Sequence, residues 1–98
     1  MLILATLAEE PLHGYAIAKR IQQKSDNTLR AEEGSLYPAL QRLLIEGWAS
    51  GKWVTSARNR KIRVYRLTVA GRKQLTVERQ RVSRLIDGLT RVMRLSEV

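Results

Sequence analysis

The chain has 98 residues, of which 44% are hydrophobic, and this is enough for one domain with a modest core. Cysteine is absent, which excludes a disulfide framework, a thiolate metal site and a cysteine nucleophile. A formal net charge of +9 favours an anionic partner, either nucleic acid or an anionic membrane surface.

An apolar run from Leu2 to Ala8 predicts a first, buried helix. Pro11 stops it, because proline restricts the residue before it and cannot continue a helix. The run is too short to span a membrane and lacks the basic lead of a signal peptide. Nothing in it points outside the cell, so we expect a cytoplasmic protein with no membrane partner.

A second helix is expected from about His13 to Lys24, and Ser25 to Thr28 would end it. His13 is the only histidine, and we assign it a capping or packing role at the helix start, since no cysteine or carboxylate cluster accompanies it. Residues 29–33 are interpreted as a loop. One face of the helix is expected to be apolar and to carry Tyr15, Ile17, Ala18 and Ile21.

A third helix is bounded by Ser35 as N-cap and Gly47 as terminator, with Pro38 in its first turn. Its core stripe is formed by leucines at helical spacing, namely Leu36, Leu40, Leu43 and Leu44. The remaining positions are expected to be exposed and are candidates for contacts with a partner: Ser35, Tyr37, Pro38, Gln41 and Arg42. For Tyr37, packing of the ring under the following hairpin is an equal alternative.

After Gly47 the pattern changes to that of strands, Trp48–Val54 and Ile62–Leu67, separated by the polar loop Thr55–Arg60. Every charged side chain from Lys52 to Lys73 is cationic. Such a hairpin can bind phosphates, although its charges could also serve solubility alone. Trp48 and Trp53 are interpreted as core or hairpin packing rather than as a sandwich for a flat ligand.

Thr68 can cap a last helix that continues to about Leu95. Apolar residues recur at seven-residue intervals along it, so one apolar stripe persists through several turns. Leu75 is expected to pack on its own chain. The rest of the stripe exceeds what a small domain can cover, and we expect it to pack against the same helix and the first helix of a second copy: Val82, Leu85, Ile86, Leu89, Val92 and Met93.

The expected fold class is mainly α with a small β-hairpin: a winged helix-turn-helix domain over residues 1–67, followed by a dimerisation helix over residues 68–98. The third helix would enter the major groove of double-stranded DNA, and the basic hairpin, or wing, would follow its phosphates. Lys19 and Arg20 on the second helix are either clamps on the DNA backbone, which we favour, or a solvated face. The predicted DNA-binding residues are Lys19, Arg20, Ser35, Tyr37, Pro38, Gln41, Arg42, Arg58, Arg60, Lys61 and Arg63.

Four segments together resemble the PadR family of bacterial transcriptional regulators: Leu12–Ala18 (LHGYAIA), Gly34–Leu43 (GSLYPALQRL), Glu46–Trp48 (EGW) and Tyr65–Lys73 (YRLTVAGRK). The resemblance covers nearly the whole chain. It implies a winged-helix regulator of the repressor type that dimerises through a C-terminal helix and binds a roughly palindromic operator. It further implies that Tyr37 and the wing residues 58–61 take part in DNA contact.

Two features depart from the family pattern, namely the length of the first helix and the residue at position 69. The first helix is expected to be short at its N-terminus, which would alter part of the dimer packing or of a small-molecule pocket. Val69 stands where proline is common, a change of little weight because proline is dispensable in a first turn.

The predicted function is therefore a homodimeric, sequence-specific DNA-binding transcriptional regulator. No phosphate loop, nucleophile elbow or metal-ligand spacing is present in the sequence, so we predict no enzyme, no catalytic residue, no metal and no cofactor. The sequence offers no signature from which a small-molecule effector can be assigned. Two other classes remain open, an RNA-binding winged helix and a protein-interaction module that docks through the last helix.

Overall fold

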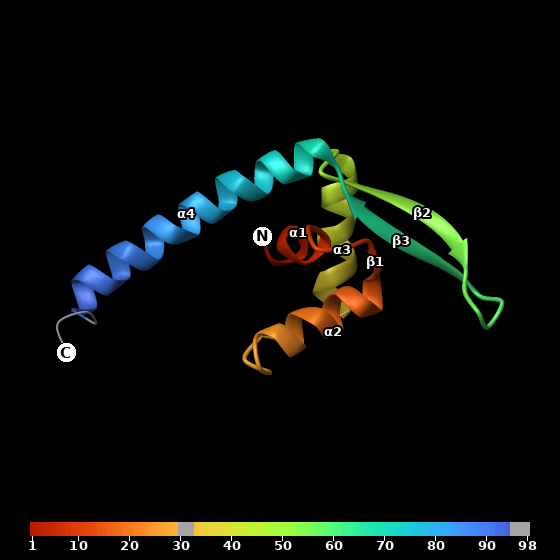
Figure 1. Ribbon diagram of the computed structural model, residues 1–98, viewed down its shortest axis with the longest axis horizontal. Helices are drawn as coiled ribbons and strands as arrows, with labels where there is room; N and C mark the ends of the chain where they lie inside the picture. The colour runs from red at the N-terminus through yellow and green to blue at the C-terminus, as the bar shows by residue number, and fades with distance from the viewer. Residues whose placement is uncertain (30–32, 95–98) are drawn as a thin grey trace.

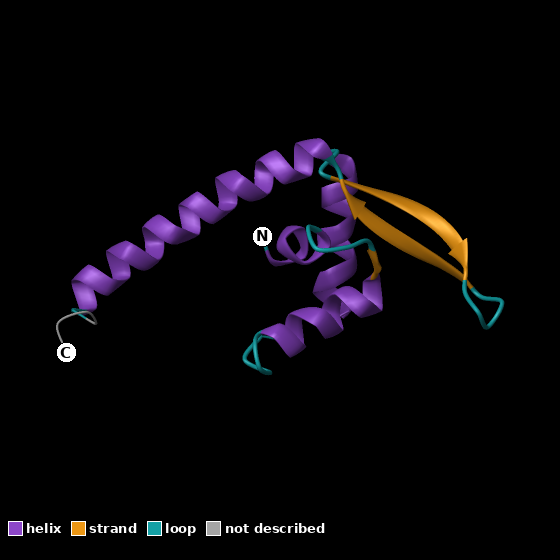
Figure 2. Ribbon diagram, viewed as in Figure 1, coloured by secondary structure: helices purple, strands orange, loops and turns teal. Residues whose placement is uncertain are grey.

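The computed structural model describes residues 1–29 and 33–94. Three helices, α1 (Leu2–Leu7), α2 (Gly14–Lys24) and α3 (Glu33–Ile45), form the body of the molecule. A hairpin of β2 (Ala49–Thr55) and β3 (Lys61–Leu67) and a long helix α4 (Val69–Met93) project from this body in opposite directions (Figure 1). The expected fold class, mainly helical with a small sheet and a long C-terminal helix, is confirmed (Figure 2).

The core lies where the three helices meet the base of the hairpin. Its most completely buried side chains are Leu4 of α1, Ile17 of α2 and Leu40 of α3. Leu36 and Leu43 join them and Leu44 is half-buried, so the predicted core stripe of the third helix is confirmed. Trp48 packs against the same cluster, as expected.

Helix α2 is capped by His13, whose Nδ1 accepts a hydrogen bond from the Ala16 amide at 3.3 Å. The expected capping role of this histidine is confirmed. The expectation that Tyr15 shares the apolar face of the helix is wrong, because its side chain is 64% exposed. Gly14, three residues before Ile17, takes the buried position instead, and Tyr15 lies about a third of a turn away from that face.

A two-residue strand, β1 (Leu12–His13), is present that the sequence pattern does not predict. It pairs antiparallel with β3, Leu12 with Tyr65 and His13 with Val64, and gives a sheet in the order β1-β3-β2. This pairing fixes the start of α2 to the base of the hairpin.

Helix α3 includes Glu33 and Gly34, so Ser35 lies inside the helix and the prediction that it is the N-cap is wrong. Pro38 consequently lies in the second turn rather than the first. A proline there cannot donate to the carbonyl of Gly34, and that carbonyl is on an exposed residue that water can reach. Of the loop expected at 29–33, Leu29 lies outside any helix, whereas residues 30–32 fall outside the described part of the chain.

Gly47 terminates α3, as predicted, because its left-handed backbone conformation cannot continue the helix beyond Ile45. Gly47 has φ +75°, its amide donates to the carbonyl of Leu44, and the amide of Trp48 donates to that of Leu43. This pair of bonds satisfies carbonyls at the helix end and turns the chain into β2.

The start of α4 is held against the end of α3 by Thr68. Its hydroxyl accepts a hydrogen bond from the Gly71 amide at 3.0 Å, as the predicted cap requires, and donates to the carbonyl of Gly47 at 2.6 Å. A Cβ at Gly71 would lie 2.0 Å from the Trp48 carbonyl oxygen, so only glycine allows this approach. Leu75 is buried, which confirms that this part of the stripe packs on its own chain. The expected helix end, Leu95, lies outside the described residues.

Candidate nucleic-acid interface

The tip of the wing is a short turn that presents cations to solvent. The Ser56 amide donates to the Arg60 carbonyl at 2.7 Å, and the Asn59 amide donates to the Ser56 carbonyl at 2.9 Å. Asn59 has φ +58°, a conformation that asparagine tolerates. The side chains of Arg58, Arg60 and Lys61 are exposed around this turn, as the sequence predicts.

The predicted contact positions on α3 are all exposed. They occupy the side of the helix away from the buried leucines and comprise Ser35, Tyr37, Pro38, Gln41 and Arg42. Tyr37 is half exposed and packs against the start of α2 rather than under the hairpin. Its side chain is 50% exposed, but its ring also lies against Gly14, where an added Cβ would approach it to 3.2 Å.

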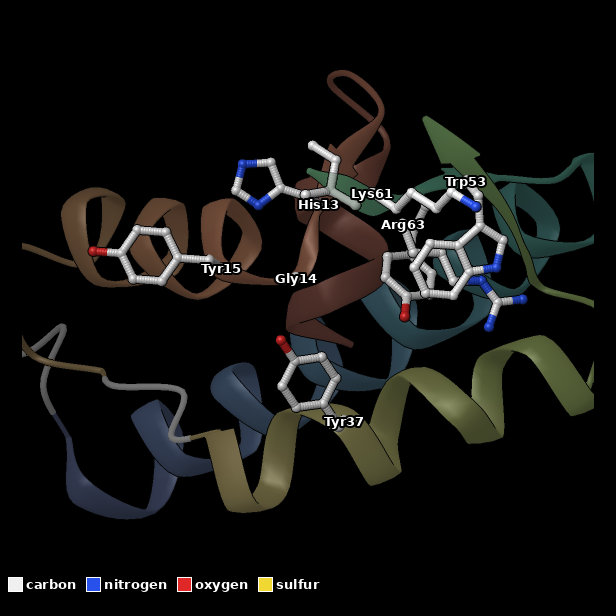
Figure 3. A pocket seen from close by; sticks show the side chains of 9 residues that line it. His13, Gly14, Tyr15, Tyr37, Trp53, Lys61 and Arg63 are labelled. Carbon is white, nitrogen blue, oxygen red and sulfur yellow. The ribbon is translucent and has the colours of Figure 1, made fainter. Parts of the chain in front are cut away.

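A hollow of about 540 Å³ lies between the start of α2, Tyr37 and the wing. In Figure 3, Gly14 is at its centre, Tyr37 points its hydroxyl toward Gly14, and Tyr15 and Trp53 lie on opposite sides. We call this surface the wing hollow. Within the described part of the chain no acidic side chain lines it, and its lining consists of His13, Gly14, Tyr15, Tyr37, Trp53, Lys61, Ile62, Arg63 and Tyr65.

Arg63 lies in the wing hollow rather than at the wing tip. Its guanidinium stacks on the rings of Trp53 and Tyr65, with carbon-to-centroid distances of 5.9 and 5.7 Å. Gly51 makes room for it, because a Cβ at that position would lie 2.4 Å from the Arg63 Nε. That Nε is buried and has no hydrogen-bond partner among the described residues. The stack therefore holds Trp53 in place while leaving its indole 63% exposed.

Arg20 and Lys19, the two cations expected on α2, differ in their surroundings. Arg20 donates to Glu9 at 3.2 Å and to Glu10 at 2.7 Å, and Lys24 also pairs with Glu9. An arginine already paired with two carboxylates has less to gain from a phosphate. Lys19 is exposed. Of the predicted contact residues, Tyr37, Lys61 and Arg63 line the wing hollow, whereas Lys19, Arg58, Arg60 and the other exposed positions of α3 do not. Arg20 is paired with its two acidic partners.

The C-terminal half of α4 carries large apolar side chains that nothing in the chain covers within the described residues. Leu85, Ile86, Leu89, Val92 and Met93 are all at least 50% exposed, and Val82 is half-buried. This stripe coincides with the one that the sequence predicts.

Two features of the interface escape reasoning from the sequence. The apolar pattern places Tyr15 on the apolar face of its helix, whereas the structure exposes it. Trp53 packs within the hairpin by stacking on Arg63, as expected, but the sequence does not indicate that its indole is largely exposed. Only the spacing from Ile17 and Ile21 could have indicated that Tyr15 leaves the buried face.

The arrangement of three helices followed by a two-stranded wing defines a winged helix-turn-helix protein. Among the described residues, no helix is both long and apolar enough to cross a membrane.

Comparison with known proteins gives the family. Residues 3–77 match the transcriptional regulator PadR-like family, and the chain belongs to this family, whose members are transcription regulators and not enzymes. The chain is 39% identical over 84 residues to the transcriptional regulator Rv3488 of Mycobacterium tuberculosis, covering 85% of this chain and 74% of that protein.

Two further similarities extend this comparison. A protein of transposon TN4556 from Streptomyces fradiae is 41% identical over 87 residues, covering 87% of this chain but only 23% of that protein's length. The crystal structure of Bacillus subtilis PadR in complex with operator DNA superposes with a TM-score of 0.70 at 25% identity, covering 76% of this chain and 42% of that one.

Proposed function

We propose that this protein is a sequence-specific, duplex-DNA-binding transcriptional regulator that acts in the cytoplasm. The observation that carries the proposal is the position of the wing hollow. It is lined by Tyr37 of α3 and by Lys61 and Arg63 of the wing, and no acidic side chain of the described residues lines it. A helix fits the major groove while a basic hairpin follows the adjacent phosphates, so both elements can engage one duplex together. The similarity to a PadR protein bound to its operator supports this arrangement.

The proposed roles of the contact residues follow from their positions. On α3, Gln41 is suited to an adenine edge and Arg42 to a guanine or a phosphate, while Ser35 and Tyr37 carry hydroxyls that can bond phosphates. Pro38 offers an apolar contact. At the wing tip, Arg58, Arg60 and Lys61 would contact the backbone, and the exposed Lys19 of α2 would do so separately.

The functional unit is proposed to be a homodimer. The exposed apolar side chains of α4 would be covered by the same helix and by α1 of a second copy. A hollow of about 300 Å³ beside α1 is a candidate contact surface for such a helix, and it is lined by the apolar residues Leu2, Ala5, Ile21 and Leu29 together with Thr6, Glu9, Lys24, Ser25 and Arg79. A two-fold dimer would present two copies of α3 to successive major grooves, about 34 Å apart, which implies a roughly palindromic operator. The resemblance to repressors of this family, and the occlusion of DNA by a bound dimer, favour repression.

An RNA-binding role is the second candidate, since the same cations would attract structured RNA. The deep, narrow major groove of A-form RNA does not admit a helix. We therefore expect duplex DNA to displace the protein from a labelled duplex at least about tenfold more effectively than double-stranded RNA of the same sequence. A filter-binding competition at moderate salt measures this. Equal or better competition by RNA would overturn the DNA assignment.

A further inference from the structure

The wing hollow contains more aromatic surface than a set of simple charge contacts requires. Tyr15 and Trp53 are 64% and 63% exposed, although large aromatic side chains are usually buried. They come from different elements, the first turn of α2 and strand β2, and lie on opposite sides of Gly14 (Figure 3). Neither is needed by the hydrophobic core, which is built from other residues.

Both exposed aromatics are held in position by neighbours. Tyr15 lies parallel to the ring of His13, with centroids 6.4 Å apart and an angle of 6° between the planes, and His13 is itself fixed as the cap of α2. Trp53 is held by the guanidinium of Arg63, for which Gly51 provides the space. Side chains that are fixed before binding lose less conformational entropy on contact with a partner.

The chemistry of the wing hollow matches a sugar–phosphate backbone. Phenol hydroxyls and a lysine ammonium can bond phosphate oxygens, and an exposed indole can cover the apolar face of a deoxyribose. The lining contains two cations, Lys61 and Arg63, and no acidic residue among those described. A backbone strand that lies beside a helix inserted in the major groove would pass between that helix and the wing.

From this juxtaposition we propose that the wing hollow binds the backbone of one DNA strand, with Trp53 covering a sugar and with Tyr15, whose hydroxyl points away from Gly14, bonding a phosphate at the edge of the hollow (Figure 3). The inference rests on the proposed function and adds two contact residues to it. Because backbone contacts carry no base information, both residues contribute equally to operator and to unrelated DNA.

Tyr15→Phe is the sharpest test, since it removes one hydroxyl from an exposed ring and leaves the core untouched. For each copy of the chain on the duplex, the dissociation constant should rise about tenfold, both for a selected operator duplex and for a scrambled duplex of the same composition. The dependence of affinity on salt should not change, because a neutral hydroxyl releases no counterion. Ser50→Ala, which removes an exposed hydroxyl from the opposite face of the wing, should leave both constants unchanged.

Trp53→Leu provides an independent second variant. If the indole covers roughly 60 Å² of sugar, its loss should weaken binding to both duplexes by about tenfold for each copy of the chain. Fluorescence anisotropy with labelled duplexes measures all constants, and thermal unfolding of each variant should match the parent protein.

The outcomes separate this inference from the function on which it rests. If the parent protein binds DNA and the dissociation constants of Tyr15→Phe stay within about twofold of the parent values on both duplexes, the wing hollow does not bind the DNA backbone. A loss of affinity for the operator duplex alone would also overturn the inference, because it would mean that the residue contacts bases rather than the backbone. Failure of the parent protein to bind any duplex would instead overturn the proposed function.

Discussion

Alanine at Arg58, Arg60 and Lys61 together is expected to abolish most of the salt-dependent affinity for DNA. Each phosphate that a cation neutralises adds a slope of about −0.9 to the plot of log affinity against log salt, so removing six cations from a dimer should flatten it by about five. If the two proteins bind equally at 1 M salt, this difference in slope corresponds to a loss of DNA affinity of up to about five orders of magnitude at 0.1 M salt. The three side chains are exposed on the wing turn, so the fold should be unaffected.

The matched control removes the same number of cations away from the tip, at Lys52, Arg66 and Lys73, all exposed. Lys52 and Arg66 lie on the body of the hairpin, paired across it with Val64 and Ser50, and Lys73 lies on α4. Titrations of operator DNA at several salt concentrations compare the two triple variants. An unchanged slope in the tip variant, or an equal change in the control, would refute the assignment of the wing tip.

Leu89→Asp is expected to prevent formation of the proposed dimer. Leu89 is 50% exposed in the single chain, and in a two-fold interface each substitution acts twice. Burial of one leucine is worth about 2 kcal/mol, so the dimer should lose at least about 4 kcal/mol, or roughly a thousandfold in its dissociation constant. Sedimentation velocity measures the change, and affinity for a palindromic site should fall because a single copy can hold only one half-site.

Gln80→Asp is the control for this variant, since Gln80 is exposed and lies on the side of α4 opposite the apolar stripe. It should remain dimeric, and both variants should keep the helical circular dichroism of the parent. A parent protein that sediments as a single chain, or a Leu89 variant that still dimerises as tightly, would mean that the apolar stripe has another occupant.

The helices and the wing could be predicted because the sequence signals that mark them are local. The leucine spacing of α3, the terminator Gly47, the cap Thr68 and the change to strand composition after Trp48 each reflect a local physical requirement that one short stretch of chain contains. The winged order and the exposure of the α4 stripe followed from these local patterns.

The missed features depend on contacts between distant segments. Strand β1 has two residues and exists because β3 offers it a partner, so no periodicity marks it. Pairing of Arg20 with Glu9 and Glu10 joins the end of α1 to α2, and stacking of Arg63 on Trp53 joins two strands. In these contacts, Arg20 and Arg63 interact with side chains of their own chain, whereas the sequence pattern alone predicts that they contact DNA.

Selection of bound sites from random duplex DNA by this protein would examine sequence-specific binding and two-fold symmetry in one experiment. Our account predicts enrichment of a palindrome whose half-sites are centred about 10 base pairs apart, since two copies of α3 must enter grooves on one face of the duplex. Recovery of no sequence above the starting pool, or of a single asymmetric half-site, would contradict it.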